Sequence, residues 1–316
     1  MPAIPPGVRG AVITGWGTAL PPKVLTNQDL EQMFDTNHDW IVERTGIHQR
    51  HVGGSTTDLS IEAGRAALAM AGLDPSEIDV VVLATTTPDR TVPASSPGIA
   101  TELGLRCGAF DINAACSGFT YGLVIAHGLI ATGANKVLLI GTDTLARITD
   151  WTDRNTAILF ADGSGAVVLE ATEHGDQLLG WHLDADGAAE RFLYSEVGGH
   201  IQMEGKEVFR RAVRIMVDSA TKSMEAAGVT ASDIALVVPH QANIRIIQAS
   251  CERLGIPMDR ASIVLHRTGN TSSASIPLAL VEALEEGRVR PGDLVLLVGF
   301  GAGMTAASAV IRWGGA

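Results

Sequence analysis

The chain has 316 residues, of which 46% are hydrophobic and 18% are charged, a balance typical of a compact α/β protein with a large core. Its formal net charge of −12 argues against nucleic-acid binding, because DNA or RNA phosphates would be repelled over most of the surface. No stretch approaches about 18 consecutive apolar residues, and the first residues lack the pattern of a secretory signal. We therefore expect no membrane span and no nucleic-acid partner.

The cysteine content indicates a reducing environment. The three cysteines, Cys107, Cys116 and Cys251, cannot all pair with one another, and their spacing is not that of metal ligands. Disulfides are rare in such compartments. The sequence therefore predicts a cytoplasmic protein without a metal site.

An internal duplication organises the chain. Residues 71–82 and 227–238 each read as a helix that ends at a glycine, a short polar turn and a buried strand. Two further pairs follow in order, at 138–141 with 296–299 and at 165–170 with 307–312. Any two α/β segments can share such features, but repeated pairs in one order favour two similar halves, 1–174 and 175–316. A site in such a fold belongs at the junction of the halves.

In the first half, Cys116 is the candidate nucleophile. The segment Phe110-Asp-Ile-Asn-Ala-Ala-Cys116 predicts a strand that enters a turn, and residues 117–132 predict a buried helix with almost no charge. A thiol at a helix N-terminus ionises more readily, because the helix dipole and free N–H groups stabilise the thiolate. The alternative is an inert core cysteine, which is the interpretation that Cys107 and Cys251 fit.

In the second half, His240 and Asn270 follow the predicted strands. His240 ends the buried run Val237-Val-Pro, at the edge of the sheet where sites of α/β folds lie. Asn270 lies in a tight turn before a helix of small residues, in the place that corresponds to the Cys116 turn of the first half. Taken alone, each could be a structural residue; together they predict one shared cavity with Cys116.

A glycine-rich loop, Gly299-Phe-Gly-Ala-Gly-Met304, follows the last long apolar strand. A dinucleotide-binding glycine motif would open a helix, whereas this loop leads into another strand at 306–312. Closely spaced glycines let backbone N–H groups approach a ligand, as in an oxyanion hole. Walker A, His-Glu-x-x-His and Gly-x-Ser-x-Gly motifs do not occur.

Four segments in one order carry a family resemblance: Ala114-Ala-Cys-Ser-Gly-Phe, Pro239-His-Gln-Ala-Asn, Gly269-Asn-Thr-Ser-Ser-Ala-Ser and Gly299-Phe-Gly-Ala-Gly. They resemble β-ketoacyl-[acyl carrier protein] synthase III, and the likeness covers nearly the whole chain. It implies a thiolase-like α/β fold of two duplicated halves in a layered α-β-α-β-α arrangement. It also implies an acyltransferase that condenses an acyl-CoA primer with malonyl-[acyl carrier protein], in a cytoplasmic homodimer that initiates fatty acid synthesis.

The resemblance implies a role for each matching residue. Cys116 would carry the acyl group, His240 and Asn270 would bind the malonyl thioester carbonyl, and the N–H groups of Cys116 and Ala302 would form the oxyanion hole. Relatives often have glycine where this chain has Ala302, but a main-chain donor survives that change. The expected CoA contacts are Trp40, Arg44, Arg154, Gly205, Phe209 and Asn243. CoA thioesters would be substrates, and no separate cofactor or metal is implied.

The same resemblance, with the basic residues near the expected cavity, predicts how the carrier protein docks. The expected docking residues are Gln241, Ala242, Asn243, Ile244, Arg245, Arg210 and Arg214. An acyl pocket is expected at Val92, Phe300 and Met304. Some relatives carry Phe where this chain has Val92 and Met304, so we expect room for branched or medium-length primers.

Four other functions share some of these features. A degradative thiolase needs a second cysteine in the terminal glycine loop, and residues 295–305 contain none. A Cys-His-Asn hydrolase would have a papain-like sequence context, and a non-catalytic acyl-binding protein would leave Cys116 idle. A starter-unit or type III polyketide-like synthase uses the same Cys-His-Asn chemistry and stays open as the main alternative.

Overall fold

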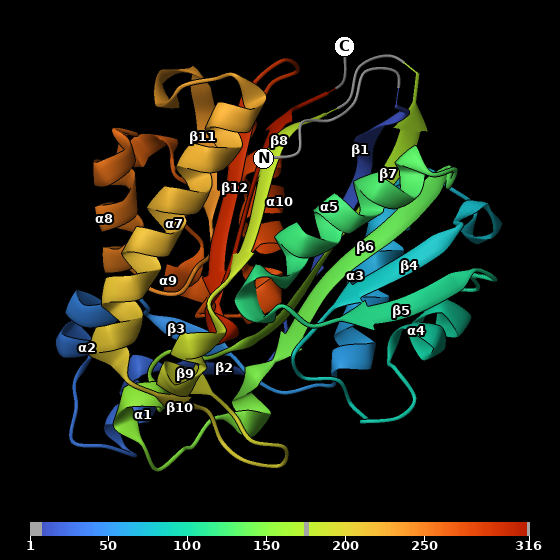
Figure 1. The fold of residues 1–316 in the computed structure, drawn as a ribbon. Coiled ribbons are helices and arrows are strands. Elements are labelled where there is room, and N and C mark those ends of the chain that lie inside the picture. The colour runs from blue at the N-terminus through green and yellow to red at the C-terminus, as the bar shows by residue number, and fades with distance from the viewer. Residues whose placement is uncertain (1–7, 174–176, 315–316) are drawn as a thin grey trace.

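The computed structural model describes residues 8–173 and 177–314, and its long strands form two sheets that lie side by side (Figure 1). The first sheet has the order β1-β7-β6-β4-β5, and the second has the order β11-β12-β13-β8. Their strands are β1 (Gly10–Ala19), β4 (Val80–Ala84), β5 (Gly108–Ile112), β6 (Lys136–Thr144), β7 (Asp162–Thr172), β8 (Leu178–Ala185), β11 (Ile234–Pro239), β12 (Leu294–Gly301) and β13 (Thr305–Arg312).

The second sheet repeats the topology of the first. In the first sheet β4 pairs with β6 in parallel, and β7 pairs antiparallel with both β6 and β1. In the second, β11 pairs with β12 in parallel, and β13 pairs antiparallel with both β12 and β8. The predicted duplication is confirmed in this topology. The boundary predicted between residues 174 and 175 lies outside the described residues.

Helices cover both sheets and fill the space between them. The helices are α1 (Asn27–Glu31), α2 (His38–Thr45), α3 (Thr56–Ala71), α4 (Ser96–Glu102), α5 (Gly118–Ala131), α6 (Arg154–Ala157), α7 (Gly205–Ala227), α8 (Ile244–Leu254), α9 (Leu265–Thr268) and α10 (Ser275–Glu285). The outer layers are α3 with α4 on the first sheet and α7 with α8 on the second, while α5 and α10 pack between the sheets. This is the predicted α-β-α-β-α arrangement.

The central helices and strands are buried because apolar residues face them from both sides. All eight residues of β12 are buried, as a continuous apolar run predicts for a strand covered by helices. Helix α5 occupies 118–131, within a residue at each end of the predicted helix, and it has no Asp, Glu, Lys or Arg. Such a helix is stable only between two packed layers.

Each central helix begins with the same unusual turn. A short 3₁₀ turn, η2 (Ala115–Ser117), leads into α5, and η7 (Ser272–Ala274) leads into α10. In the described part of the chain, Ala115 (φ 49°) and Ser272 (φ 51°) are the non-glycine residues with positive φ. A left-handed backbone at a non-glycine residue costs about 1–3 kcal/mol and persists only where surrounding contacts hold it. Both halves therefore keep a strained turn at the seam between them.

A buried carboxylate, that of Asp143 at the end of β6, joins the halves at this seam. One oxygen accepts hydrogen bonds from Thr86 N–H at 2.7 Å and from the hydroxyls of Thr85, Thr86 and Thr87. The other accepts from the N–H of Ser273 at 3.0 Å and from its hydroxyl at 2.7 Å. This carboxylate thus anchors the η7 turn of the second half to the first.

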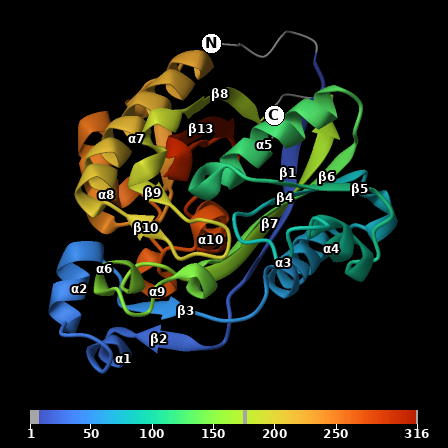
Figure 2. The same ribbon diagram turned by 60° about the horizontal axis from the view of Figure 1, so that its bottom comes forward.

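Smaller elements gather at the end of the sheets where the glycine loop lies (Figure 2). They include two hairpins, formed by β2 (Val24–Thr26) with β3 (Gln49–His51) and by β9 (Leu193–Tyr194) with β10 (Gln202–Met203). Helices α1, α2 and α6 lie beside them. Within residues 8–173 and 177–314, no helix is both long and apolar enough to cross a membrane.

Candidate active site

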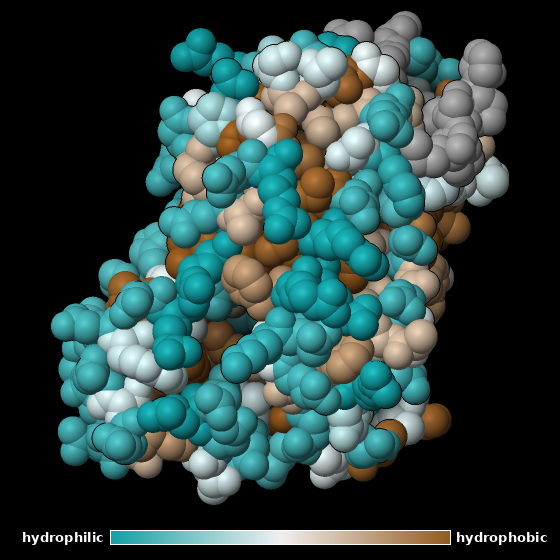
Figure 3. Space-filling view, turned by 60° about the vertical axis from the view of Figure 1, so that its left-hand side comes forward, coloured by the Kyte–Doolittle hydropathy of each residue, from teal (hydrophilic) through white to brown (hydrophobic). Residues whose placement is uncertain are grey.

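A cavity of about 660 Å³ contains the three predicted catalytic side chains, Cys116, His240 and Asn270. They come from the two seam turns and the end of β11, so both halves of the fold contribute. The face formed by α7, α8 and α2 is largely hydrophilic, with hydrophobic atoms visible in a hollow (Figure 3). The fold thus brings Cys116, His240 and Asn270 together in one cavity, as the sequence predicts.

Cys116 lies in η2, directly before α5, as the sequence predicted. Burial is the main influence on the pKa of Cys116, which is raised to about 12. A hydrogen bond with Ser272 lowers the pKa, and the nearby charge of Asp143 raises it. The expectation of a thiolate stabilised by the helix N-terminus is thus opposed by desolvation. Burial of Cys116 therefore disfavours the thiolate in the free enzyme.

His240 is buried beside the cavity, with 1% of its surface exposed. Its Nδ1 lies 2.6 Å from the hydroxyl of Ser275, and the ring of Phe300 meets its imidazole edge-on at 5.4 Å. Burial lowers the pKa of His240 to about 3. The imidazole is therefore neutral at physiological pH.

Asn270 is fixed through both its backbone and its side chain. Its N–H donates to Leu159 O, and its carbonyl accepts from Ala161 N–H, both at 2.9 Å. Its Oδ1 accepts the N–H of Ser272 at 3.0 Å. Since the Ser272 N–H can only donate, the side-chain atom of Asn270 that faces it is the oxygen. The NH2 group of Asn270 is then available to donate to a ligand.

The glycine loop lies against the nucleophile. A Cβ on Gly301 would come within 2.7 Å of the Cys116 nitrogen, and one on Gly299 would come within 3.5 Å of His240 Cβ. Glycine is thus required at 301 for the chain to pass so close. The peptide between Gly301 and Ala302 therefore passes directly beside the Cys116 backbone, as an oxyanion hole formed by these two residues requires.

Aromatic and basic side chains surround Trp40 at one end of the cavity. The guanidinium carbons of Arg44 and Arg154 lie 4.6 and 4.7 Å from the centre of the Trp40 ring. Trp40, Arg44, Gly205, Phe209 and Asn243 line the cavity, and Arg154 lies between two residues that do. An indole with two guanidiniums is suited to a purine next to phosphates. The residues expected to bind CoA are thus brought together.

Two family descriptions match the chain: 3-oxoacyl-[acyl-carrier-protein] synthase III over residues 110–187, and the C-terminal part of the same enzyme over residues 224–313. A β-ketoacyl-[acyl-carrier-protein] synthase III of Roseiflexus castenholzii is 49% identical, over 96% of this chain and 98% of that protein. The chain belongs to this family. The predicted family, thiolase-like fold and acyltransferase class are confirmed.

Solved structures of synthase III enzymes share the whole fold. The enzyme of Aquifex aeolicus superposes with a TM-score of 0.94 at 42% identity, covering 96% of this chain and all of that one. The priming β-ketosynthase of the R1128 polyketide pathway superposes at 0.91 with 35% identity, covering 99% and 98%. The polyketide-type alternative is therefore not favoured, since the fatty-acid-type relatives are more similar.

The structure corrects part of the predicted docking surface of this synthase III chain. Gln241 is fully buried, and its amide makes four internal hydrogen bonds, to Pro239 O, Ser262 O, Val264 N and Leu265 N. Ala242 is 8% exposed but lines the cavity, whereas Ile244, the first residue of α8, packs against the apolar cluster that contains Ile47 and Ile247. Three residues of the 241–245 stretch line the cavity, namely Ala242, Asn243 and Arg245.

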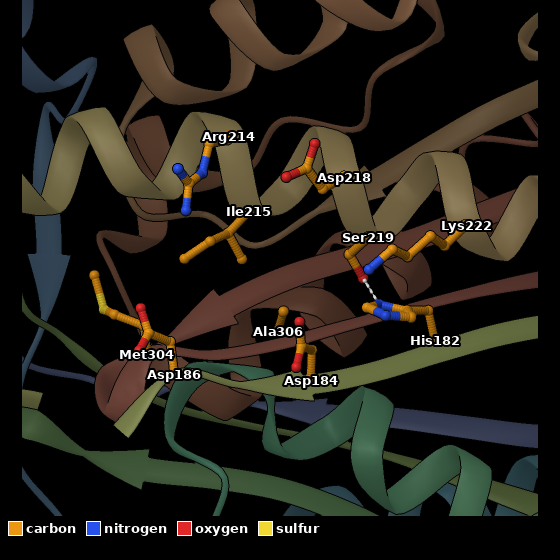
Figure 4. Close-up of a pocket in the computed structure, with 10 residues that line it drawn as sticks. All are labelled: His182, Asp184, Asp186, Arg214, Ile215, Asp218, Ser219, Lys222, Met304 and Ala306. Atoms are coloured by element: carbon orange, nitrogen blue, oxygen red, sulfur yellow. Dashed lines mark hydrogen bonds between the residues drawn. The ribbon is translucent and has the colours of Figure 1, made fainter. Parts of the chain in front are cut away.

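Arg210 and Arg214 do not line the catalytic cavity. Arg210 is exposed and pairs with Glu207 at 2.7 Å, so its charge is already locally compensated. Arg214 lines a separate cavity of about 100 Å³ between α7 and the strands β8 and β13 (Figure 4). That cavity also carries Asp184, Asp186 and Asp218, which would oppose an acidic partner. Carrier docking at Arg210, which follows the cavity residue Phe209, stays a prediction.

Two of the three expected acyl-pocket residues are also elsewhere. Phe300 lines the catalytic cavity, but Val92 is 83% exposed at the surface and does not line it. Met304 is buried and borders the smaller cavity of Figure 4, because the loop turns after Gly303 towards β8. Val92 therefore contributes nothing to the cavity of a single chain, and the wider primer range stays a prediction.

Several cavity residues were not predicted from sequence. Lys206 adds a third positive charge to those of Arg44 and Arg245, and apolar walls come from Ile158, Leu159, Phe160, Leu193, Met203, Val208 and Ile246. The β9–β10 hairpin that supplies two of them has no motif of its own. Within the described ranges, no group of three or more His, Cys, Asp or Glu side chains is placed to hold a metal ion.

Proposed function

We propose that this enzyme condenses an acyl-CoA primer with malonyl-[acyl carrier protein] to give a 3-oxoacyl-[acyl carrier protein], CO2 and CoA, the first condensation of fatty acid synthesis. The observation that carries the proposal is the convergence of Cys116, His240 and Asn270 on one cavity. The family relationship supports the same reaction. Each residue then has a defined chemical task.

In the first half-reaction the Cys116 thiol gives up its proton as its sulfur attacks the thioester carbonyl of acyl-CoA, and this proton balances the one that the departing CoA thiolate takes up. The negative charge that develops on the carbonyl oxygen is stabilised by the N–H groups of Cys116 and Ala302. The carbon–sulfur bond to CoA then breaks, and the CoA thiolate takes up a proton as it leaves. The product is an acyl-Cys116 thioester and free CoA.

In the second half-reaction the malonyl thioester loses CO2, and the electron pair of the broken bond forms an enolate. Neutral hydrogen-bond donors, the His240 imidazole and the Asn270 amide, stabilise the enolate oxygen. The enolate carbon attacks the acyl-Cys116 carbonyl, and the Cys116 thiolate leaves and is protonated by solvent. No electrons are exchanged with a redox partner, so we propose CoA thioesters as substrates and no separate cofactor.

The reaction is tested directly by product analysis. Purified enzyme, a series of acyl-CoAs of two to twelve carbons and malonyl-[acyl carrier protein] should give 3-oxoacyl-carrier masses two carbons longer than the primer, with one CO2 per product. Without malonyl-[acyl carrier protein], the enzyme should consume no more than one acyl-CoA per active site. Continued consumption of acyl-CoA should require the malonyl carrier. Hydrolysis of acyl-CoA without chain extension would contradict the proposed function.

Carrier docking at Arg245 gives a second test. Arg245 is exposed, lies 5.7 Å from the Phe209 ring and borders the cavity. Because acyl carrier proteins are acidic, Arg245→Glu should raise KM for malonyl-[acyl carrier protein] about tenfold or more, with a much smaller effect on acylation by acyl-CoA. Added salt should raise the wild-type KM as the charges are screened.

Arg214→Glu is the matched control for Arg245→Glu, because it makes the same charge change on an exposed arginine outside the catalytic cavity. Its KM for the carrier substrate should stay within about twofold of wild type, as expected for a site that does not face the partner. Equal effects of the two variants would show that overall charge, rather than docking at Arg245, sets the affinity.

We further propose that the enzyme acts in the cytoplasm as a homodimer. Cys107, Cys116 and Cys251 are all free, which supports a reducing compartment. Strand β5 is the edge of its sheet with β4 as its neighbour, and Phe110 on it is 36% exposed, which supports a protein interface there. Light scattering of the purified enzyme tests the dimer; a monomer at assay concentrations would contradict it.

A further inference from the structure

Ser275, the first residue of α10, contacts the catalytic histidine from behind. Its Oγ lies 2.6 Å from His240 Nδ1, and Ser275 is fully buried. The backbone N–H of Gln241 donates to the same oxygen at 3.3 Å. This hydroxyl therefore has two neighbours, and their hydrogen-bonding roles decide which imidazole nitrogen carries the proton.

The Gln241 contact is held in place by its own side chain. That amide donates to the carbonyls of Pro239 and Ser262 and accepts from the N–H groups of Val264 and Leu265. All four bonds lie in the protein interior, so the segment that follows β11 cannot easily shift. The N–H of Gln241 is thereby kept aimed at Ser275.

Counting protons gives the tautomer. A serine hydroxyl has one proton and two lone pairs, and the Gln241 N–H occupies one lone pair. If His240 Nδ1 also carried a proton, it would occupy the other lone pair, and the hydroxyl proton would need a third partner. Within the described residues, Ser275 Oγ has no hydrogen-bond partner besides His240 and Gln241. A buried hydroxyl proton without an acceptor is unfavourable, so the hydroxyl donates to Nδ1.

We propose that Ser275 is a positioning residue that holds His240 in the Nε2–H tautomer, so that the imidazole donates a hydrogen bond to the enolate oxygen. This inference rests on the proposed function, because the enolate forms only in the decarboxylation step. With the other tautomer, a nitrogen lone pair would face the enolate oxygen and repel it. The serine thus selects the catalytic form of the histidine without touching substrate.

The surroundings of His240 agree with a neutral donor. Phe300 packs against its ring, and the N-terminus of the 11-residue helix α10 faces it through Ser275. The positive end of a helix disfavours a second proton on the imidazole. Burial acts in the same direction and lowers the pKa of His240. A fixed single tautomer, rather than a titrating group, is what this environment stabilises.

Replacing Ser275 by alanine should slow malonyl decarboxylation by about tenfold to a hundredfold, less than loss of the donor itself. Acylation of Cys116 by acyl-CoA should change little, because that step uses the oxyanion hole. Ser223→Ala is the control: it removes a fully buried hydroxyl that donates to Ala220 within α7 at 2.9 Å, and Ser223 lies outside the network around Gln241 and Ser275. It should leave both steps unchanged.

Nitrogen-15 NMR of histidine-labelled wild-type enzyme gives a readout that is independent of folding defects in the variants. The His240 signals, assigned by their loss in His240→Gln, should show a bare Nδ1 and a protonated Nε2 at pH 6, 7 and 8. A protonated Nδ1 would overturn the proposal, as would a Ser275→Ala variant that loses acylation and decarboxylation equally. If wild type acylates Cys116 but never decarboxylates malonyl carrier, the proposed function fails, whereas the tautomer measurement still stands.

Discussion

Replacing Cys116 by alanine should abolish condensation, with a loss on the order of 10⁴-fold or more, because the acyl group then has no covalent carrier. Intact-protein mass spectrometry of wild type with acyl-CoA should show one added acyl mass, and this mass should be absent from the variant. Cys116 is the only one of the three free cysteines that lines the catalytic cavity. Malonyl decarboxylation should persist in the variant, since His240 and Asn270 are intact.

Cys251→Ala and Cys107→Ala are the controls for this experiment. Cys251 is buried in α8 and does not line the catalytic cavity, so acyl-CoA bound there cannot reach its sulfur. Cys107 is half-buried away from the cavity, and burial raises its pKa. Both variants should retain acylation and condensation. Label on Cys251 or Cys107 in the wild type would refute the mechanism.

Substitution of the enolate-stabilising residues should separate the two half-reactions. His240→Ala and Asn270→Ala should each lower the rate of malonyl decarboxylation by about 10²–10³, the usual cost of one lost donor to a developing oxyanion. Acylation of Cys116 should fall far less, because its charge develops at the backbone N–H groups instead. Single-turnover assays of each step, with radiolabelled malonyl carrier and with acyl-CoA, measure the two rates separately.

His182→Ala is a suitable control for His240→Ala. Like His240, His182 lies close to a serine hydroxyl, that of Ser219 at 3.0 Å, but it is only partly buried and lies in the smaller cavity of Figure 4. It should leave both half-reactions within about twofold of wild type, as expected of a residue remote from the chemistry. A uniform loss of acylation and decarboxylation in His240→Ala would contradict the assigned division of roles.

The chemistry-bearing residues could be predicted from the sequence because they depend on backbone topology. The repeated strand–turn–helix pattern places Cys116 and Asn270 at corresponding turns, and a duplicated fold brings corresponding turns together at its seam. His240 follows a buried strand of the same sheet as the glycine loop. For such residues, order along the chain is enough to predict proximity.

The predictions that failed concern whether a side chain is buried or exposed, and a short sequence motif does not determine this. Gln241 and Arg245 belong to one short stretch, yet a bend before α8 buries the first and exposes the second. Met304 follows the glycine loop, yet it borders the smaller cavity, because the path of a loop follows long-range packing rather than local pattern. Ser275 was part of a quoted motif, but its contact with His240 joins segments that are distant in sequence.

The seam carboxylate of Asp143 makes the two halves inseparable. Its donors come from the loop after β4 on one side and from Ser273 on the other, so either half alone would leave a desolvated anion with only part of its hydrogen bonds. The halves match in topology, yet they are not interchangeable modules. The side chain that fixes the turn before α10 is thus also the one that joins the two halves of the fold.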